Sequence, residues 1–118
     1  MARILHVGVG PLGHLILNDL VARGLGSVVG VVDPSPTLTG TSVSKLVPGT
    51  NPEQKILHSL SEFSAWDQVD CAIVTTSSDL PRCEPTFREI LEHGKPVVST
   101  CEELIYPWLR HKALADRL

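Results

Sequence analysis

Gly8-Val9-Gly10-Pro11-Leu12-Gly13 is the stretch that decides the fold, because of the segments on either side of it. It follows an apolar run, residues 4–7, that is typical of a strand, and the spacing of apolar residues over 12–23 predicts an amphipathic helix. Asp33 lies twenty positions beyond Gly13, at the end of a second strand-like run, residues 28–32. A lone glycine motif is weak, but this strand–turn–helix–strand–acid order is a dinucleotide-binding fingerprint.

The rest of the chain alternates strand-like and helix-like segments, which predicts an α/β fold. We expect a Rossmann-type, doubly wound and mostly parallel sheet flanked by helices. Further strands are predicted at 56–57, 71–74 and 97–98, helices at 62–66, 81–93 and 102–118, and one helical turn at 42–46 inside the irregular segment 34–52. In the helix at 81–93, Phe87, Ile90 and Leu91 are predicted to face inward, with Gly94 as its stop.

Length and composition exclude several classes of protein. The 118 residues suffice for one domain, and the net charge of −3 argues against binding to nucleic acid or to an anionic membrane surface. No run is long enough to cross a bilayer. The three cysteines are odd in number and form no C-x-x-C pair, which favours a reducing cytoplasm over a disulfide scaffold or a metal site. The chain stops inside an amphipathic pattern, so we expect a single dinucleotide-binding domain, an N-terminal fragment that lacks a C-terminal substrate domain.

Each residue of the glycine loop has an expected role. Gly8 permits the tight turn, Gly10 lets the backbone approach a pyrophosphate, and Gly13 lets the helix pack against the strand. Pro11 suits the first helical turn, and the amides that follow, from Leu12 on, would bind the negative charge. The alternatives are three turn glycines with no ligand, or the glycine-rich loop of an S-adenosylmethionine methyltransferase.

Asp33 is expected to accept the ribose hydroxyls of the adenosine half and to repel a 2′-phosphate. No arginine follows it, since the next residues are Pro34, Ser35 and Pro36. The predicted cofactor is therefore NAD rather than NADP. The alternative for Asp33 is a turn residue before proline.

Two hydroxyl-rich turns follow the later strands, where ligands of open α/β sheets bind. We expect Thr75, Thr76 and Ser77 to line the nicotinamide ribose, although Ser78 or Asp79 would also suit a helix cap. Thr100, Cys101 and Glu102 are expected to contact the nicotinamide end. The pair Thr100 and Glu103 has the spacing of a capping box, which favours a structural role for Glu103.

On these residues, and above all on Val98-Ser99-Thr100-Cys101-Glu102-Glu103-Leu104 followed by Tyr106-Pro107, the chain resembles the N-terminal NAD(P)-binding domain of the dihydrodipicolinate reductase-like superfamily. The branch with 2,4-diaminopentanoate dehydrogenase is the most similar. Dihydrodipicolinate reductases of the lysine pathway usually carry Arg-Met where this chain has Pro11-Leu12. Related sugar oxidoreductases carry a catalytic lysine at the place of Glu103.

The resemblance implies an oxidoreductase that transfers a hydride to or from a C=N or amine substrate. It also implies a second domain that supplies the substrate pocket and the catalytic residues, and a homo-oligomer as the full-length enzyme. This chain alone would bind NAD without turnover. The alternatives are a non-enzymatic NAD(H)-sensing domain and a lysine-pathway dihydrodipicolinate reductase proper.

Overall fold

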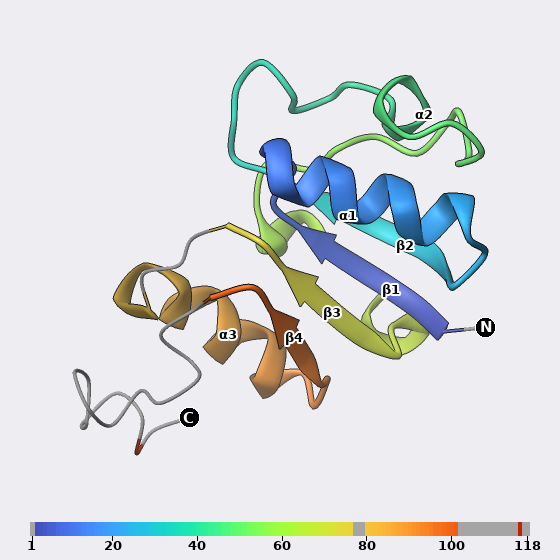
Figure 1. Cartoon of the computed structure of the whole chain (residues 1–118). Coiled ribbons are helices and arrows are strands. Elements are labelled where there is room, and N and C mark those ends of the chain that lie inside the picture. The colour runs from blue at the N-terminus through green and yellow to red at the C-terminus, as the bar shows by residue number, and fades with distance from the viewer. Residues whose placement is uncertain (1, 77–79, 102–115, 117–118) are drawn as a thin grey trace.

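A computed structural model describes residues 2–76, 80–101 and 116 of the chain. The strands β1 (Ala2–Val7), β2 (Gly26–Val32), β3 (Cys71–Val74) and β4 (Val97–Ser99) form a sheet in the order β2-β1-β3-β4, and each pairing is parallel (Figure 1). The chain goes from β1 to β2 on one side and resumes with β3 on the other. The predicted Rossmann-type α/β fold is confirmed, and its topological switch point lies between β1 and β3.

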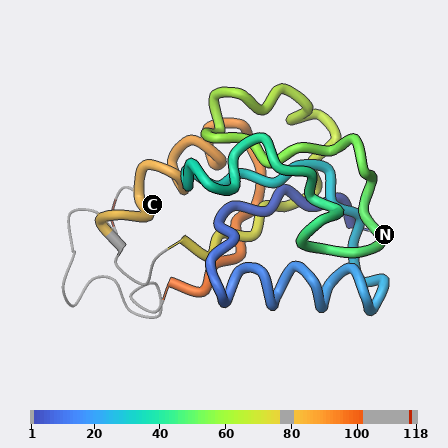
Figure 2. The backbone as a smooth tube through the Cα atoms, turned by 90° about the horizontal axis from the view of Figure 1, so that it is seen from above, coloured from blue at the N-terminus to red at the C-terminus, as the bar shows by residue number. Residues whose placement is uncertain are grey.

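The two long helices cover opposite faces of the sheet, as Figures 1 and 2 show together. The helix α1 (Pro11–Ala22) packs against one face and α3 (Leu80–Glu92) against the other. Both helices end at the predicted glycines, because Gly24 and Gly94 adopt positive φ angles of 65° and 73°. The amide of Leu25 donates to the Leu20 carbonyl, which completes a Schellman cap on α1.

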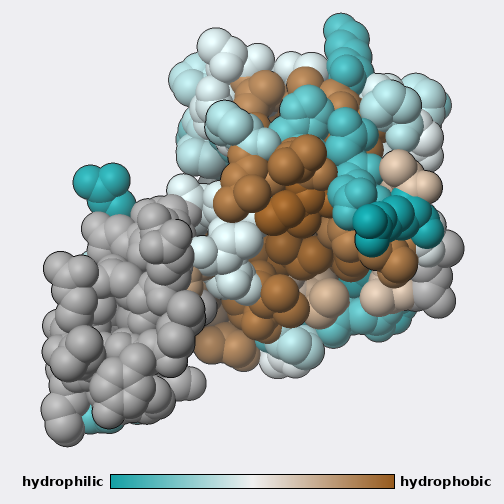
Figure 3. Space-filling model, in the orientation of Figure 1, coloured by the Kyte–Doolittle hydropathy of each residue, from teal (hydrophilic) through white to brown (hydrophobic). Residues whose placement is uncertain are grey.

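The buried side of α1 is narrower than the apolar pattern suggests. Leu17 and Gly13 are buried, whereas Leu12 and Leu15 are 51% and 68% exposed. In α3, Phe87 and Ile90 are buried as predicted, but the inward prediction for Leu91 is wrong, because its side chain is 43% exposed. The space-filling view shows an apolar area on the α1 side of the molecule (Figure 3). Exposed large apolar residues include Leu12, Leu15 and Val98.

The prediction of a strand at 56–57 is wrong, because Leu57 makes only an isolated parallel bridge with Val32. Polar Lys55 and His58 flank these two residues, which leaves too short an apolar run to extend the pairing. The irregular segment is packed nevertheless. It contains the short helix α2 (Val43–Leu46), which confirms the predicted helical turn. Its apolar residues Val43 and Val47 are buried with Leu17, Val31 and Ile56.

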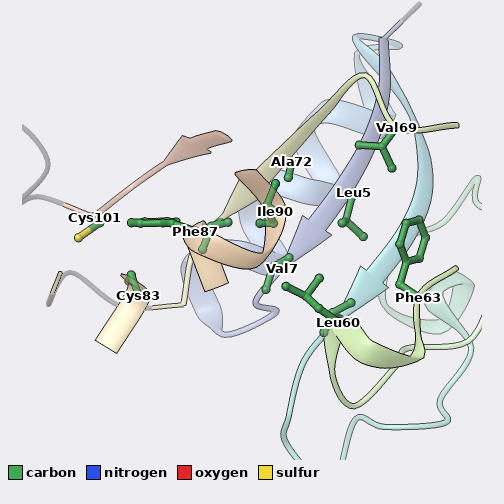
Figure 4. Close-up of a cluster of buried hydrophobic side chains, with 12 residues drawn as sticks. Leu5, Val7, Leu60, Phe63, Val69, Ala72, Cys83, Phe87, Ile90 and Cys101 are labelled. Atoms are coloured by element: carbon green, nitrogen blue, oxygen red, sulfur yellow. The ribbon is translucent and has the colours of Figure 1, made fainter. Parts of the chain in front are cut away.

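A second buried cluster fills the α3 side of the sheet (Figure 4). It joins β1 and β3 to Phe87 and Ile90 of α3 and to Leu60 and Phe63. In place of the predicted helix at 62–66 there are two 3-10 turns, η1 (Leu60–Glu62) and η2 (Trp66–Gln68). Phe63, between them, has extended backbone and enters the core, which interrupts the helix.

The predicted helix over 102–118, with its kink at Pro107, lies outside the described residues. Within the described part of the chain, no helix has the length and apolarity needed to cross a bilayer.

Candidate functional site

The glycine loop lies between β1 and α1, at the carboxyl ends of the strands. Both neighbouring strands hold it. The Gly8 amide donates to the Val32 carbonyl of β2 at 2.8 Å, and the Thr75 amide, just after β3, donates to the Val7 carbonyl at 2.9 Å. The loop therefore starts from a fixed position at the switch point, which is where open α/β sheets bind their ligands.

Two glycines of the loop are required by the protein itself. Gly8 has a φ of 100°, and a Cβ on it would come within 3.0 Å of both Thr75 and Thr76. A Cβ on Gly13 would overlap the carbonyl oxygen of Gly8 and Oγ1 of Thr75. The expected roles of Gly8 in the turn and of Gly13 in close helix packing both agree with this geometry.

Gly10 is different, because nothing in the described protein requires a glycine there. Its φ of −69° and ψ of −174° are open to any residue. Apart from its chain neighbours Val9 and Pro11, no described residue has an atom within 4 Å of where its Cβ would be. The space over Gly10 would thus admit a ligand up to the backbone.

The start of α1 next to Gly10 presents unpaired donors. Gly10 is the N-cap residue and contributes no side-chain cap, and the first turn contains no acidic residue. The first helical hydrogen bond is from the His14 amide to the Gly10 carbonyl, at 2.8 Å. Within residues 2–76 and 80–101, no hydrogen bond is made by the amides of Gly10, Leu12 or Gly13. These donors and the helix dipole together favour a bound anion.

Asp33 has a role in the site that sequence reasoning missed. Its Oδ2 accepts the Val9 amide at 2.6 Å, and its Oδ1 accepts the Ser35 amide at 2.8 Å. Asp33 is 9% exposed as a residue, and its two hydrogen bonds fix the glycine loop against the end of β2. Each carboxylate oxygen has a second acceptor position, so the predicted contact with ribose hydroxyls is still available.

The hydroxyl of Thr75 makes a hydrogen bond to the glycine loop. It donates to the Gly8 carbonyl at 2.8 Å, and it lies beside Gly13. The hydroxyl thus packs behind the loop, and its expected contact with the nicotinamide ribose stays a prediction. Thr76 is exposed at the same edge, with its hydroxyl 3.8 Å from Sγ of Cys83. Ser77, Ser78 and Asp79 lie outside the described residues.

After β4, Thr100 is exposed, and its amide donates to the Val74 carbonyl at 3.2 Å. The Cys101 side chain is buried in the cluster of Figure 4, and its expected contact with the nicotinamide end stays a prediction. The Cys101 amide donates to Ser99 Oγ at 3.0 Å, so the polar cap of this turn comes from Ser99. Glu102 and Glu103, including the proposed capping box, lie outside the described residues.

His6 is fully buried beneath the loop. Its ring lies near the backbone of Gly8 and Gly13, but neither ring nitrogen makes a hydrogen bond of ordinary geometry to the described residues. Burial lowers the pKa of His6, so its imidazole is neutral at pH 7. The loop therefore rests on an uncharged ring.

Comparisons with known proteins rest on structure alone. The chain matches no family model, and a search of curated proteins finds no match. An amine dehydrogenase from Mycobacterium smegmatis matches it with a TM-score of 0.87 and 25% identity, over 98% of this chain and 34% of that one. This chain thus spans about a third of the length of the amine dehydrogenase.

Two other matches show the fold alone. WlbA dehydrogenase from Bordetella pertussis, in complex with NADH and UDP-GlcNAcA, has a TM-score of 0.61 and 22% identity, over 83% of this chain and 28% of its own. The Rex-family repressor RSP, in complex with β-NAD⁺ and operator DNA, has a TM-score of 0.63 and 13% identity, over 99% of this chain and 58% of its own. The same fold thus occurs in dehydrogenases and in a repressor.

Proposed function

We propose that this chain is the NAD(H)-binding domain of an oxidoreductase. The observation that carries the proposal is Gly10, a glycine that no described residue requires, together with the amides of Gly10, Leu12 and Gly13, which are unpaired within the described residues. A pyrophosphate has the charge and the oxygen acceptors for that position. WlbA dehydrogenase, which shares this fold, is in complex with NADH, and we assign the same cofactor to this chain.

The residues fit a dinucleotide in the following way. The amides of Gly10, Leu12 and Gly13 would bind the pyrophosphate, while Pro11 starts the helix without needing a hydrogen bond. Asp33 would accept ribose hydroxyls with its remaining lone pairs and disfavour a 2′-phosphate. Thr76 and Thr100 are exposed at the edge where the nicotinamide half would lie. The bound cofactor supplies hydride transfer, and the protein supplies its position.

We further propose that the complete protein is of the dihydrodipicolinate reductase-like type and acts on a C=N or amine substrate. The match to an amine dehydrogenase supports this substrate class. In this proposal a further domain supplies the substrate pocket and the catalytic residues, and the whole enzyme is a homo-oligomer. The chain of 118 residues would then bind NADH without turnover.

Calorimetric titration of the chain with NADH, NADPH and S-adenosylmethionine tests the proposal. We expect NADH to bind with micromolar to millimolar affinity, NADPH to bind at least about tenfold more weakly because of Asp33, and S-adenosylmethionine not to bind. If NADH does not bind at millimolar concentration, the proposed function is wrong. Tighter binding of NADPH than of NADH would overturn the assignment of Asp33.

A further inference from the structure

His14 lies directly after the glycine loop, in the first turn of α1. It is half-buried on α1, one residue beyond Gly13. Its Nε2 lies 2.6 Å from the carbonyl oxygen of Leu46, the last residue of α2. A carbonyl only accepts, so Nε2 carries the proton and donates it. This bond joins the first turns of α1 to the segment that connects β2 with Leu57.

Backbone hydrogen bonds in that segment connect α2 with Asp33. Past α2 the chain doubles back, and residues 40–43 pair with residues 54–56 through three backbone hydrogen bonds of 2.8 to 2.9 Å. The next residue, Leu57, donates to the Val31 carbonyl and accepts the Asp33 amide, at 2.9 Å in each case. The Asp33 carboxylate then binds the Val9 amide of the glycine loop.

The hydrogen bonds therefore form a closed frame. It runs from His14 through Leu46 and the paired residues to Leu57 and Asp33, and returns through Val9 to the glycine loop. Two positions on this frame, Asp33 and the start of α1, are those that would hold the ribose and the pyrophosphate of one adenosine half. The bond between Asp33 and Val9 links these two positions directly, and the path through His14 and Leu46 supports the same two positions from the α2 side.

We propose that His14 is a positioning residue for the adenosine half of the dinucleotide, acting by holding α2 against α1. This inference rests on the proposed function. His14 does not touch the cofactor in this proposal. It sets the distance between the pyrophosphate amides and the Asp33 carboxylate, so that both contacts are made together without reorganisation of the segment.

The experiment is calorimetry with ADP-ribose and with NADH on the wild-type chain and on three His14 variants. His14→Ala removes the donor, so we expect about five- to tenfold weaker binding of both ligands. His14→Gln places an amide N–H at about the reach of Nε2 and should restore affinity to within about twofold. His14→Asn is too short to reach Leu46 and should bind as weakly as the alanine variant. The exposed His58 provides the matched control, His58→Ala, with unchanged affinity.

The outcomes separate the two proposals. No binding of NADH by the wild-type chain refutes the proposed function itself. Wild-type binding with equal affinity in all three His14 variants refutes the role of His14 and leaves the proposed function intact. If His14→Ala does not fold, the difference in ligand affinity between the glutamine and asparagine variants still tests the role of His14. Equal affinity of those two variants would overturn the inference, because only the glutamine side chain is long enough to reach the Leu46 carbonyl.

Discussion

The carboxyl and amino ends of the strands differ in what their polar groups are bound to. At the carboxyl ends, the amides of Gly10, Leu12 and Gly13 are unpaired within the described residues, and open space lies over Gly10. At the amino ends there is a pocket of about 360 Å³ with uncharged lining, bordered by the start of β2 and by residues 49–51.

Three of the polar side chains that line that pocket make hydrogen bonds within the protein. Gln54 donates to the Val28 carbonyl, Thr50 donates to the Val47 carbonyl, and Asn51 accepts the Glu53 amide. Three side chains of the pocket are thus paired within the protein, whereas the three loop amides are unpaired within the described residues. The comparison is why we place the proposed binding site at the loop, where donors are unpaired and a glycine has no packing role, and not at the pocket.

The largest expected effect is that of Gly13→Ala. The new Cβ would overlap backbone at the Gly8 carbonyl, which cannot move without disturbing β1 and β3. We expect a loss of about 3 kcal/mol in the free energy of unfolding, measured by urea denaturation. A matched control is Gly24→Ala, at the other end of α1, which has open space and only the strain of a positive φ, about 1 kcal/mol. Equal stability of the two variants would contradict the packing assigned to Gly13.

Asp33→Asn should have the next largest effect. One of the two oxygens that accept the Val9 and Ser35 amides becomes an NH₂ group, which leaves two donors facing each other. We expect NADH binding to weaken about tenfold or more, because a charge-assisted contact is lost. The affinity for NADPH should fall less, so the ratio of the two affinities narrows in calorimetry. An unchanged ratio would show that Asp33 does not select the cofactor.

The burial of His6 beneath the glycine loop predicts that the stability of the fold depends on pH. Burial lowers the pKa of folded His6, while the unfolded chain has an ordinary pKa of about 6.5. The unfolded state therefore takes up the proton first, and stability falls as the pH drops below about 6.5. His6→Met should remove this step from the unfolding free energy between pH 7 and 5. A wild-type chain without such a step would contradict the buried, neutral ring.

Arg3 and Asp70 predict a smaller effect at the amino ends, in a lower pH range. Two hydrogen bonds from the Arg3 side chain hold the pKa of Asp70 below its ordinary value, so the pair stabilises the fold above about pH 4. That contribution is lost as the pH falls through the lowered pKa. Both side chains are exposed, so Asp70→Asn should lower the melting temperature only slightly at pH 7. The difference in melting temperature between the variant and the wild type should vanish in acid. A difference that stays constant with pH would contradict the lowered pKa of Asp70.

Sequence reasoning located the elements better than it assigned side chains. The glycine loop, α1, α3 and the strands follow from local patterns, since apolar periodicity and glycine stops act over a few residues. The single bridge at Leu57 and the exposure of Leu91 depend on which neighbours pack nearby, and no local pattern contains that information. For the same reason the helix at 62–66 became two turns around Phe63.

In the candidate site, too, local sequence patterns predict positions but not the residues that pack against them. The positions of Gly8, Gly13 and Asp33 follow from the spacing of the motif, but their partners are residues far along the chain. Thr75 closes the back of the loop, and the Asp33 carboxylate binds Val9. Both facts depend on the register of the parallel strands. The bond of His14 to Leu46 has no signal in the sequence beyond the position of His14 next to Gly13.

Gly10→Ala tests the central claim most directly, because Gly10 is the loop glycine that packing does not explain. The account predicts an unfolding free energy within about 0.5 kcal/mol of wild type, since the backbone angles suit alanine and the space around it is open. In the same protein, NADH binding measured by calorimetry should fall at least about tenfold, because the methyl group would occupy the place of the pyrophosphate. Unchanged NADH affinity in a stable Gly10→Ala chain would contradict the account.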